Sequence, residues 1–315
     1  MAKVHLSAVS RTQGNNAAVK DGTVSPDAFE LDFTEVPVLV NAFRRMVREV
    51  EFDVCEMAIT TYICARAHNK PFTAIPTFLV RGFHHDAIVY NTKSGIESPK
   101  DIEGRRVGVN RGYTVTTGVW ARGILEEEFG VDLKKVTWVL SGDEHVAEYQ
   151  EPSNVIPLEP GRTLEEALIS GDVDAVVGTE IDHPDIAHLI PDPKERGYGA
   201  LRERGIFPIN HLIVVKDELL IAYPNLAADL FNTFARSKAL YVDKLRQGTV
   251  ENLTAADKMH LKVMEITGSD PLPYGIGKNR ATIEKLIDYA MSQSIIDRRP
   301  SVESLFAEGT RALNA

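Results

Sequence analysis

Cysteine is scarce in this chain: among 315 residues, only Cys55 and Cys64 carry a thiol. Each lies inside an apolar run, where a free cysteine behaves as a small buried hydrophobe, and their spacing matches no metal-binding motif. We therefore expect both thiols to pack in the core rather than to react.

Long apolar runs are absent as well. No segment reaches the about 20 consecutive apolar residues of a membrane span, and the first residues lack the apolar centre of a signal peptide. Positive charge is in deficit, because 35 Lys and Arg stand against 45 Asp and Glu, which gives a net charge of -10. This balance argues against nucleic acid and anionic membranes as partners. We expect a cytoplasmic protein whose acidic ligands are bound by locally placed arginines.

The chain also lacks the motifs of common cofactor sites. The glycines from Gly104 to Gly112 have the wrong spacing for a dinucleotide or phosphate loop, and no His-Glu-x-x-His or Cys-x-x-Cys pattern occurs. We therefore expect no cofactor. A divalent metal remains an alternative, because several carboxylates and imidazoles are of the ligand type. These residues are Glu56, His84, His85, Glu180, Asp182, His183 and His211.

Strand-like and helix-like segments alternate along the chain, which predicts an α/β protein. A polar segment over residues 144–160 is expected as a surface excursion because prolines interrupt it. The expected strands are residues 4–9, 29–36, 53–59, 72–80, 87–90, 106–109, 136–140, 174–178 and 207–215. The main expected helices are residues 116–129, 164–170, 226–245, 255–267 and 280–294.

One short stretch combines a fixed cation with two imidazoles, namely Arg81-Gly82-Phe83-His84-His85. It lies between two strand-like runs, so its side chains are expected at the end of a strand. A guanidinium can bind a carboxylate and a histidine can move a proton near neutral pH. A solvated turn is the alternative for such a connection.

A series of further motifs accompanies this stretch and, in this order, resembles the bacterial 4,5-dihydroxyphthalate decarboxylases over nearly the whole chain. No single motif is specific, but the set is. The motifs are residues 10–12, 53–62, 81–85, 90–92, 98–109, 205–209, 211, 273–275, 279–280 and 299–306.

The resemblance implies a two-lobed fold of the type 2 periplasmic-binding-protein kind, with two hinge crossings and a ligand cleft between the lobes. We place the first lobe at residues 1–93 and 208–315 and the second at residues 94–207. The implied reaction removes carbon dioxide from a small aromatic diacid, converting 4,5-dihydroxyphthalate to 3,4-dihydroxybenzoate (protocatechuate). The same fold is natural for a solute-binding protein that passes a small organic anion to an ABC transporter. Assembly into a homo-oligomer is left open.

Such a reaction needs an acid, a base and groups that bind an anion. For the acid we consider His84 or His85, of which only one is expected to act, because neighbouring residues of a strand point to opposite faces. For the base, or for a group that orients the ring hydroxyl, we consider Glu56 and His211. Glu56 has an alternative role as an ordinary buried carboxylate paired with an arginine.

Arginines are the natural carboxylate ligands, because the guanidinium fork matches a carboxylate in bidentate fashion. The alternative for each is a surface salt bridge. Thr60 and Thr61 lie at an expected helix start, where they either bind an anion or cap the helix. The candidate substrate-binding residues are Arg11, Thr60, Thr61, Arg81, Asn110, Arg111, Tyr113, Thr114, Thr116, Tyr274 and Arg280.

Overall fold

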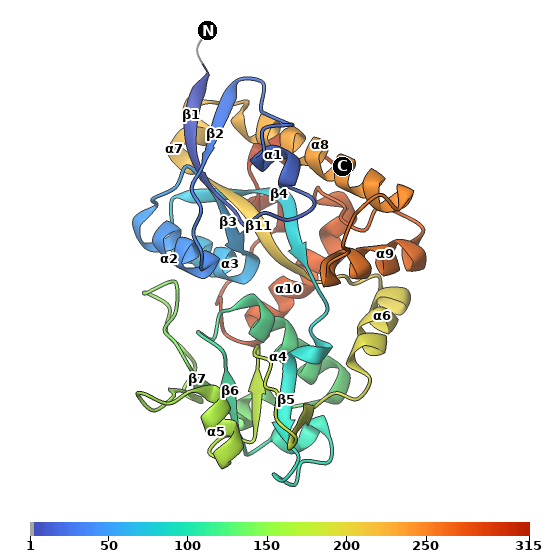
Figure 1. Ribbon diagram of the computed structural model, residues 1–315. Coiled ribbons are helices and arrows are strands. Elements are labelled where there is room, and N and C mark those ends of the chain that lie inside the picture. The colour runs from blue at the N-terminus through green and yellow to red at the C-terminus, as the bar shows by residue number, and fades with distance from the viewer. Residues whose placement is uncertain (1–2) are drawn as a thin grey trace. The chain divides into compact units, whose positions relative to one another are not determined.

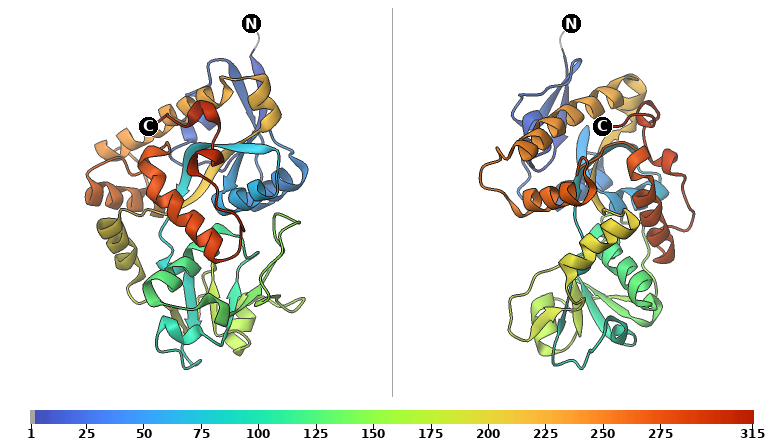
Figure 2. Two further views of the ribbon diagram at one scale, coloured as in Figure 1. Left: turned by 180° about the vertical axis from the view of Figure 1, so that it is seen from behind. Right: turned by 90° about the vertical axis from the view of Figure 1, so that its right-hand side faces the viewer.

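The computed structural model describes residues 3–315 and divides the chain into two compact units, each with its own sheet (Figures 1 and 2). Unit 1 contains the chain up to Arg81, Ile209–Glu284 and Pro300–Ala315, and unit 2 contains Gly82–Pro208 and Lys285–Arg299.

The division between the units differs from the boundaries expected from the sequence. Residues 82–93 belong to unit 2, because strand β5 (Ile88–Asn91) pairs with two strands of the unit 2 sheet. Residues 285–299 also belong to unit 2, although helix α10 (Arg280–Ser292) begins in unit 1. The helical pattern continues without a break across this point, so the sequence gives no sign that the chain changes unit there.

Unit 1 is built on a five-stranded mixed sheet with the order β2-β1-β3-β11-β4. Strands β1, β2 and β3 are parallel, and β11 runs antiparallel to both β3 and β4. Strand β3 is buried on both faces, which explains its continuous apolar sequence, and Glu56 is its one charged residue. The strands are β1 (Val4–Val9), β2 (Phe29–Phe33), β3 (Val54–Ala58), β4 (Phe72–Arg81) and β11 (Ile209–Lys216).

Several helices of unit 1 pack against this sheet, whereas α1 (Ala17–Lys20) and α9 (Ala255–Thr267) contact α8 (Leu226–Gln247). In α2 the residues Leu39, Phe43, Met46 and Val47 are buried, and their helical spacing gives the helix one apolar face. These helices are α1 (Ala17–Lys20), α2 (Leu39–Glu49), α3 (Ile59–Ala67), α7 (Asp217–Ala222), α8 (Leu226–Gln247), α9 (Ala255–Thr267) and the start of α10.

Unit 2 has a six-stranded sheet with the order β10-β5-β9-β6-β7-β8, in which β6 to β9 are parallel. Its helices are α4 (Thr116–Phe129), α5 (Leu164–Ser170), α6 (Pro193–Arg204) and the second part of α10. The remaining strands are β6 (Arg106–Val109), β7 (Thr137–Leu140), β8 (Val155–Pro157), β9 (Ala175–Val177) and β10 (Ile186–His188).

The prediction for residues 144–160 was wrong in part. Glu144, His145 and Val146 are buried, and Val155–Pro157 forms the edge strand β8. A three-residue edge strand that ends in a proline has too little periodicity to be recognised from the sequence. Helices α6 and α7 were also missed.

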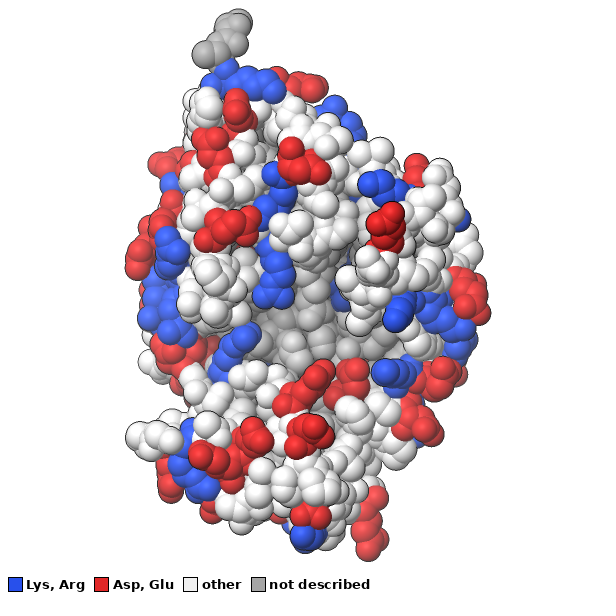
Figure 3. All heavy atoms as spheres, viewed as in Figure 1, with Lys and Arg blue, Asp and Glu red and all other residues white. Residues whose placement is uncertain are grey.

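Charged side chains of both signs are interspersed on the face shown in Figure 3. Within residues 3–315, no helix combines the length and apolar character that crossing a membrane requires.

Candidate functional site

The carboxyl ends of the parallel strands gather polar residues at one edge of each sheet. In unit 1, β1, β3 and β4 end at the edge where the antiparallel strand β11 begins. The carboxyl edge is where open α/β sheets bind ligands. The loop after β1, the start of α3, Arg81 and His211 all lie at this edge.

Glu56 and His211 form the central pair of the unit 1 edge. His211 lies opposite Ala58 in the ladder between β11 and β3, so its side chain is on the same face as that of Glu56. The Nδ1 atom of His211 lies 2.6 Å from Oε1 of Glu56, whose side chain is fully buried, while the His211 side chain is 23% exposed. The ring also packs edge-on against Phe43, with centroids 5.1 Å apart. One ring nitrogen is therefore fixed by a carboxylate.

The loop after β1 completes the surroundings of the Glu56 carboxylate. The backbone N–H of Arg11 donates to Oε2 at 2.9 Å, and Nε2 of Gln13 donates to Oε1 at 3.3 Å. Asn16 also fixes this loop, because its Nδ2 donates to the carbonyl of Arg11 at 2.9 Å. The side chain of Arg11 is exposed. Glu56 thus binds three donors and is paired with no guanidinium in these contacts.

Thr60 and Thr61 lie in the first turn of α3 and are buried. The helix begins at Ile59, and the residue in the N-cap position is Ala58, so neither threonine caps the helix. The N–H groups of this first turn lie directly after the strand that carries Glu56, where a helix N-terminus favours an anion.

Arg81 and Tyr274 are buried in unit 1. The Arg81 guanidinium donates to the carbonyl of Pro273 at 3.2 Å and to the side chain of Asn279. Burial lowers the pKa of Arg81 to about 10, and burial raises the pKa of the Tyr274 phenol above its usual range. Both side chains therefore lie in the interior of unit 1.

Arg280 lies on the surface at the start of α10, where it pairs with Glu303 and, at 3.5 Å, with Glu284. These contacts match the salt-bridge alternative for this arginine.

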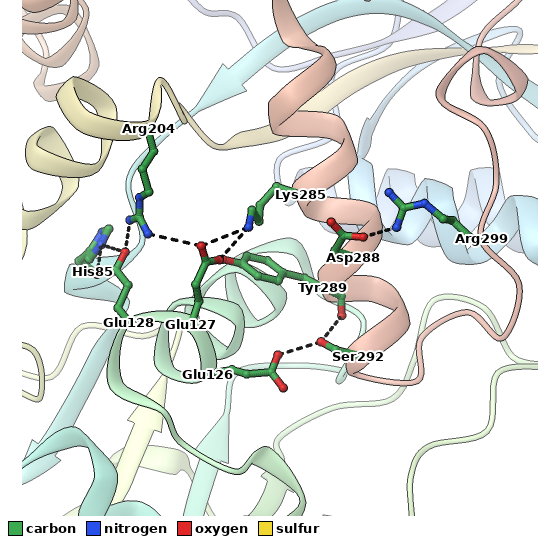
Figure 4. Close-up of polar contacts among 10 residues, drawn as sticks. All are labelled: His85, Glu126, Glu127, Glu128, Arg204, Lys285, Asp288, Tyr289, Ser292 and Arg299. Carbon is green, nitrogen blue, oxygen red and sulfur yellow. Dashed lines mark hydrogen bonds and ion pairs between the residues drawn. The ribbon is translucent and has the colours of Figure 1, made fainter.

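His85 belongs to an ion-pair network of unit 2 (Figure 4). The His85 ring is 3% exposed, and its Nε2 lies 3.2 Å from both carboxylate oxygens of Glu128, which also pairs with Arg204. Burial raises the pKa of the Glu128 carboxyl, but the bonds from His85 and Arg204 outweigh burial and leave this pKa below its ordinary value. His85 is therefore engaged in holding the ends of α4 and α6 together.

His84 has different surroundings. Its ring is stacked on Trp120 with centroids 6.4 Å apart and 8° between the planes. It lines a groove of about 590 Å³ together with Thr117, Glu180 and Asp182. Of the two histidines predicted as the acid, His84 lines this larger groove, whereas His85 lines a cavity of about 20 Å³ beside Glu128.

The loop after β6 carries four of the predicted binding residues, and Thr116 is the first residue of the following helix α4. The Nδ2 of Asn110 donates to the carbonyl of Gly178 at 2.7 Å, and the backbone N–H of Arg111 donates to Oγ of Ser141 at 2.8 Å. Tyr113, Thr114 and Thr116 are buried, and burial raises the pKa of the Tyr113 phenol.

Two buried charges beside this loop were not predicted. Glu144 accepts hydrogen bonds from the backbone of Tyr113 and from the hydroxyl of Thr114, and burial raises its pKa. Arg122 donates to the carbonyl of Tyr113 at 2.5 Å. The sequence did offer a signal for Arg122, because it is the one charge in the apolar run 119–125.

The predicted metal-ligand candidates can be compared with the ligand-type side chains that lie close together in the structure. Within residues 3–315, the ligand-type side chains that meet in a group of three are His5, Glu30 and Asp32, all of them exposed on β1 and β2. The candidates predicted from the sequence form no such group in this part of the chain.

Comparisons with known proteins give a matching family and two named relatives. Residues 42–242 match the family described as NMT1/THI5 like. A 4,5-dihydroxyphthalate decarboxylase of Comamonas testosteroni is 28% identical over 329 residues, which cover 97% of each chain. A protein of the same name from Pseudomonas putida is 34% identical over 166 residues, which cover 48% of this chain and 64% of that protein.

Solved structures show the same architecture at low identity. The periplasmic aliphatic sulphonate binding protein SsuA of Escherichia coli is 10% identical, with a TM-score of 0.56 over 99% of this chain and 100% of that chain. The desulfurization enzyme DSZB is 14% identical, with a TM-score of 0.52 over 97% of this chain and 96% of that chain. These matches confirm the predicted two-lobed periplasmic-binding-protein-like fold. The group contains both binding proteins and an enzyme, so the fold alone does not decide the activity.

Proposed function

The chain belongs to the NMT1/THI5-like family, and from that premise we propose that it is a carboxy-lyase acting on a hydroxylated aromatic diacid. The proposed substrate is 4,5-dihydroxyphthalate and the proposed product is 3,4-dihydroxybenzoate. The relative from Comamonas testosteroni supports this, because its similarity covers 97% of both chains. One structural observation carries the proposal: the buried carboxylate of Glu56 holds the partly exposed imidazole of His211 at the carboxyl edge of a sheet.

The chemistry requires that the ring accept electrons before carbon dioxide leaves, because direct cleavage would leave an unstabilised electron pair in the ring plane. The hydroxyl para to the carboxylate loses its proton, and the ring carbon that bears the carboxylate gains one, which gives a dienone. The bond from this carbon to the carboxylate then breaks, and its electron pair restores the aromatic ring as a phenolate. The phenolate regains a proton, so each turnover consumes one proton and releases one carbon dioxide.

We assign the transfer of the hydroxyl proton to His211. When Nδ1 donates to Glu56, Nε2 of the neutral ring is an acceptor, so it takes the proton from the para hydroxyl and later returns it to the phenolate. Glu56 fixes the tautomer and the orientation of the ring, as a buried carboxylate does in a catalytic triad.

Two further roles complete the proposal. His84 is the candidate acid for the ring carbon, because it lines the groove of about 590 Å³, whereas His85 pairs with Glu128. Arg11 is the candidate ligand of a substrate carboxylate, because its side chain is exposed while its backbone N–H binds Glu56.

The test is turnover by the purified protein. The protein is incubated with 4,5-dihydroxyphthalate, with and without a chelator, while carbon dioxide and 3,4-dihydroxybenzoate are measured. We expect both products in equal amounts, and loss of activity with the chelator would show that a metal takes part. Saturable binding without turnover would instead indicate a solute-binding protein and would refute the enzyme proposal.

A variant separates the role of His211 from folding. His211→Asn keeps a nitrogen donor for Glu56 but removes Nε2, so kcat should fall by about 10²–10⁴-fold while the protein remains folded. His5→Asn is the matched control, because His5 is an exposed histidine of the same unit, and its activity should be unchanged. Equal activity of the two variants would exclude His211 as the base. Separate His84→Gln and His85→Gln variants test the acid in the same assay.

A further inference from the structure

Arg111 has a backbone conformation that arginine rarely adopts. Its φ is 70°, in the left-handed region, and its side chain is exposed. The next residue is Gly112, which would enter this region without strain but is not among the glycines with positive φ. Strained residues persist where their surroundings over-determine them, and they cluster at functional sites. The strained position is therefore occupied by a side chain with binding chemistry rather than by the adjacent glycine.

The segment is fixed on the side before Arg111. The backbone N–H of Asn110 donates to the carbonyl of Val177 at 2.9 Å, and that of Arg111 donates to Oγ of Ser141 at 2.8 Å. A Cβ atom on Gly142 would lie 3.3 Å from the Cα atom of Arg111, so the two backbones are in close contact. Arg111 has little room to relax its conformation.

Glu144 fixes the side after Arg111. Its carboxylate accepts from the backbone N–H of Tyr113, from that of Thr114 at 3.3 Å and from Oγ1 of Thr114 at 2.5 Å. A Cβ atom on Gly112 would lie 2.6–2.7 Å from three atoms of this carboxylate. Only a glycine at position 112 lets the carboxylate reach these donors.

Arg122 binds the carbonyl of the peptide between Tyr113 and Thr114, whose N–H donates to Glu144. Its side chain is fully buried, its guanidinium lies 3.8 Å from the centre of the Tyr113 ring, and Nη2 donates to the Tyr113 carbonyl at 2.5 Å. Its Nε donates to Oε1 of Gln293 at 2.9 Å, and Nε2 of Gln293 donates to the carbonyl of Val119 at 2.9 Å. The peptide around Tyr113 therefore lies between two buried charges of opposite sign.

We propose that Arg122 and Glu144 are positioning residues that hold Arg111 in the conformation in which its guanidinium binds a carboxylate of an aromatic acid. The inference rests on the proposed function for the identity of the ligand. Buried charges are expensive to desolvate, and an apolar pair would stabilise the unit at least as well. Their use here is explained by the fixed geometry that they impose on the segment before α4.

The first experiment exploits opposite effects on stability and binding. Arg111→Gly removes the backbone strain, so the urea midpoint should rise, while KM for 4,5-dihydroxyphthalate should rise by about tenfold or more because the fork is lost. Val50→Gly is the matched control, because Val50 is left-handed with a φ of 51° at the end of α2. This control should raise the midpoint without changing KM. An unchanged KM in Arg111→Gly would overturn the proposal.

The second experiment tests the two positioning residues. Arg122→Met and Glu144→Gln should each raise KM about tenfold with little change in kcat, and amide hydrogen exchange of residues 111–114 should become faster by a similar factor. The double variant should be no worse than the poorer single variant, because the two charges act on one peptide. Lys238→Met removes a buried charge of unit 1 and is the matched control. The proposal fails if KM and exchange respond no more than in this control.

A milder variant covers the case in which the charge variants do not fold. Thr114→Val removes the 2.5 Å bond to Glu144, and it should raise KM and exchange in the same direction by a smaller factor. If the protein binds 4,5-dihydroxyphthalate without turnover, the proposed function fails, and calorimetric Kd replaces KM in both experiments. The exchange readout is independent of turnover, so positioning and catalysis are judged separately.

Discussion

Replacing Glu56 by Gln tests the central pair of unit 1 with a change of one atom. The carboxylate accepts three hydrogen bonds, from Nδ1 of His211, the backbone N–H of Arg11 and Nε2 of Gln13, and it is fully buried. A glutamine retains one acceptor oxygen and replaces the other by an NH₂ group. An NH₂ group in the place of Oε2 faces the backbone N–H of Arg11, and one in the place of Oε1 faces both His211 and Gln13, so at least one donor loses its acceptor in either orientation.

The size of the effect follows from the burial of this site. An unsatisfied buried donor costs about 1–3 kcal/mol, which we expect as the loss in the free energy of unfolding of Glu56→Gln. If the NH₂ group faces His211, the neutral ring must move its proton to Nε2, and the atom that acts as the base is blocked. Because about 1.4 kcal/mol corresponds to a factor of ten, kcat should fall by roughly 5- to 150-fold.

Asp53→Asn is the matched control. Asp53 directly precedes the other end of β3, where its carboxylate accepts from the backbone and side chain of Ser7 at 2.9 Å and pairs with Lys216 at 2.9 Å. We expect a similar loss of stability in this variant and no loss of kcat. Comparing the two variants thus separates the loss of unfolding free energy from the loss of kcat.

Three measurements decide the outcome. Urea unfolding gives the stability of each variant, carbon dioxide release gives kcat, and the ¹⁵N resonances of His211 report its tautomer. The reasoning is refuted if Glu56→Gln retains the Nδ1–H tautomer and full kcat, or if the control loses activity to the same degree.

Three further predictions concern parts of the chain outside this pair. Burial lowers the pKa of His260 to about 4, so between pH 6.5 and 4 the unfolded chain binds a proton at His260 that the folded chain does not bind. The free energy of unfolding should therefore fall by up to about 3 kcal/mol as the pH is lowered through this window. Urea unfolding at several pH values should show a smaller fall in His260→Asn. Gly123→Ala should destabilise by about 1–3 kcal/mol, because its Cβ would lie 2.3 Å from the ring of Tyr289, whereas Gly199→Ala, with open space around it, should stabilise α6. Arg81→Lys should lower the unfolding free energy by about 1–3 kcal/mol, because the shorter lysine side chain does not reach the two internal oxygen acceptors that Nη2 of Arg81 binds; an unchanged urea midpoint would contradict this assignment.

Local periodicity accounts for most of the fold that was predicted. Strand β1 and helix α4 have the bounds expected from the sequence, because each has a clear apolar pattern and a defined end. The edge strand β8 and helix α7 were missed because a strand of three residues and a helix of six contain less than two periods of their pattern. The change of unit within α10 was missed for a different reason, since it depends on what each half packs against.

The pairing of site residues was beyond the reach of the sequence. Glu56 could be singled out as the one charge in a buried strand, but its partner His211 lies 155 positions away. His84 and His85 are adjacent in the sequence, but His84 stacks on Trp120 while His85 binds the carboxylate of Glu128, 43 positions away. Both rings are buried, and long-range packing brings the Glu128 carboxylate to His85.

Arg11 and Arg111 share a local geometry that a sequence can reveal. Each lies two residues beyond the end of a parallel strand, β1 in unit 1 and β6 in unit 2. The backbone N–H of Arg11 donates to a carboxylate oxygen of Glu56, and that of Arg111 donates to the hydroxyl oxygen of Ser141. Such a bond fixes the main chain at the carboxyl edge of the sheet, where open α/β sheets bind their ligands.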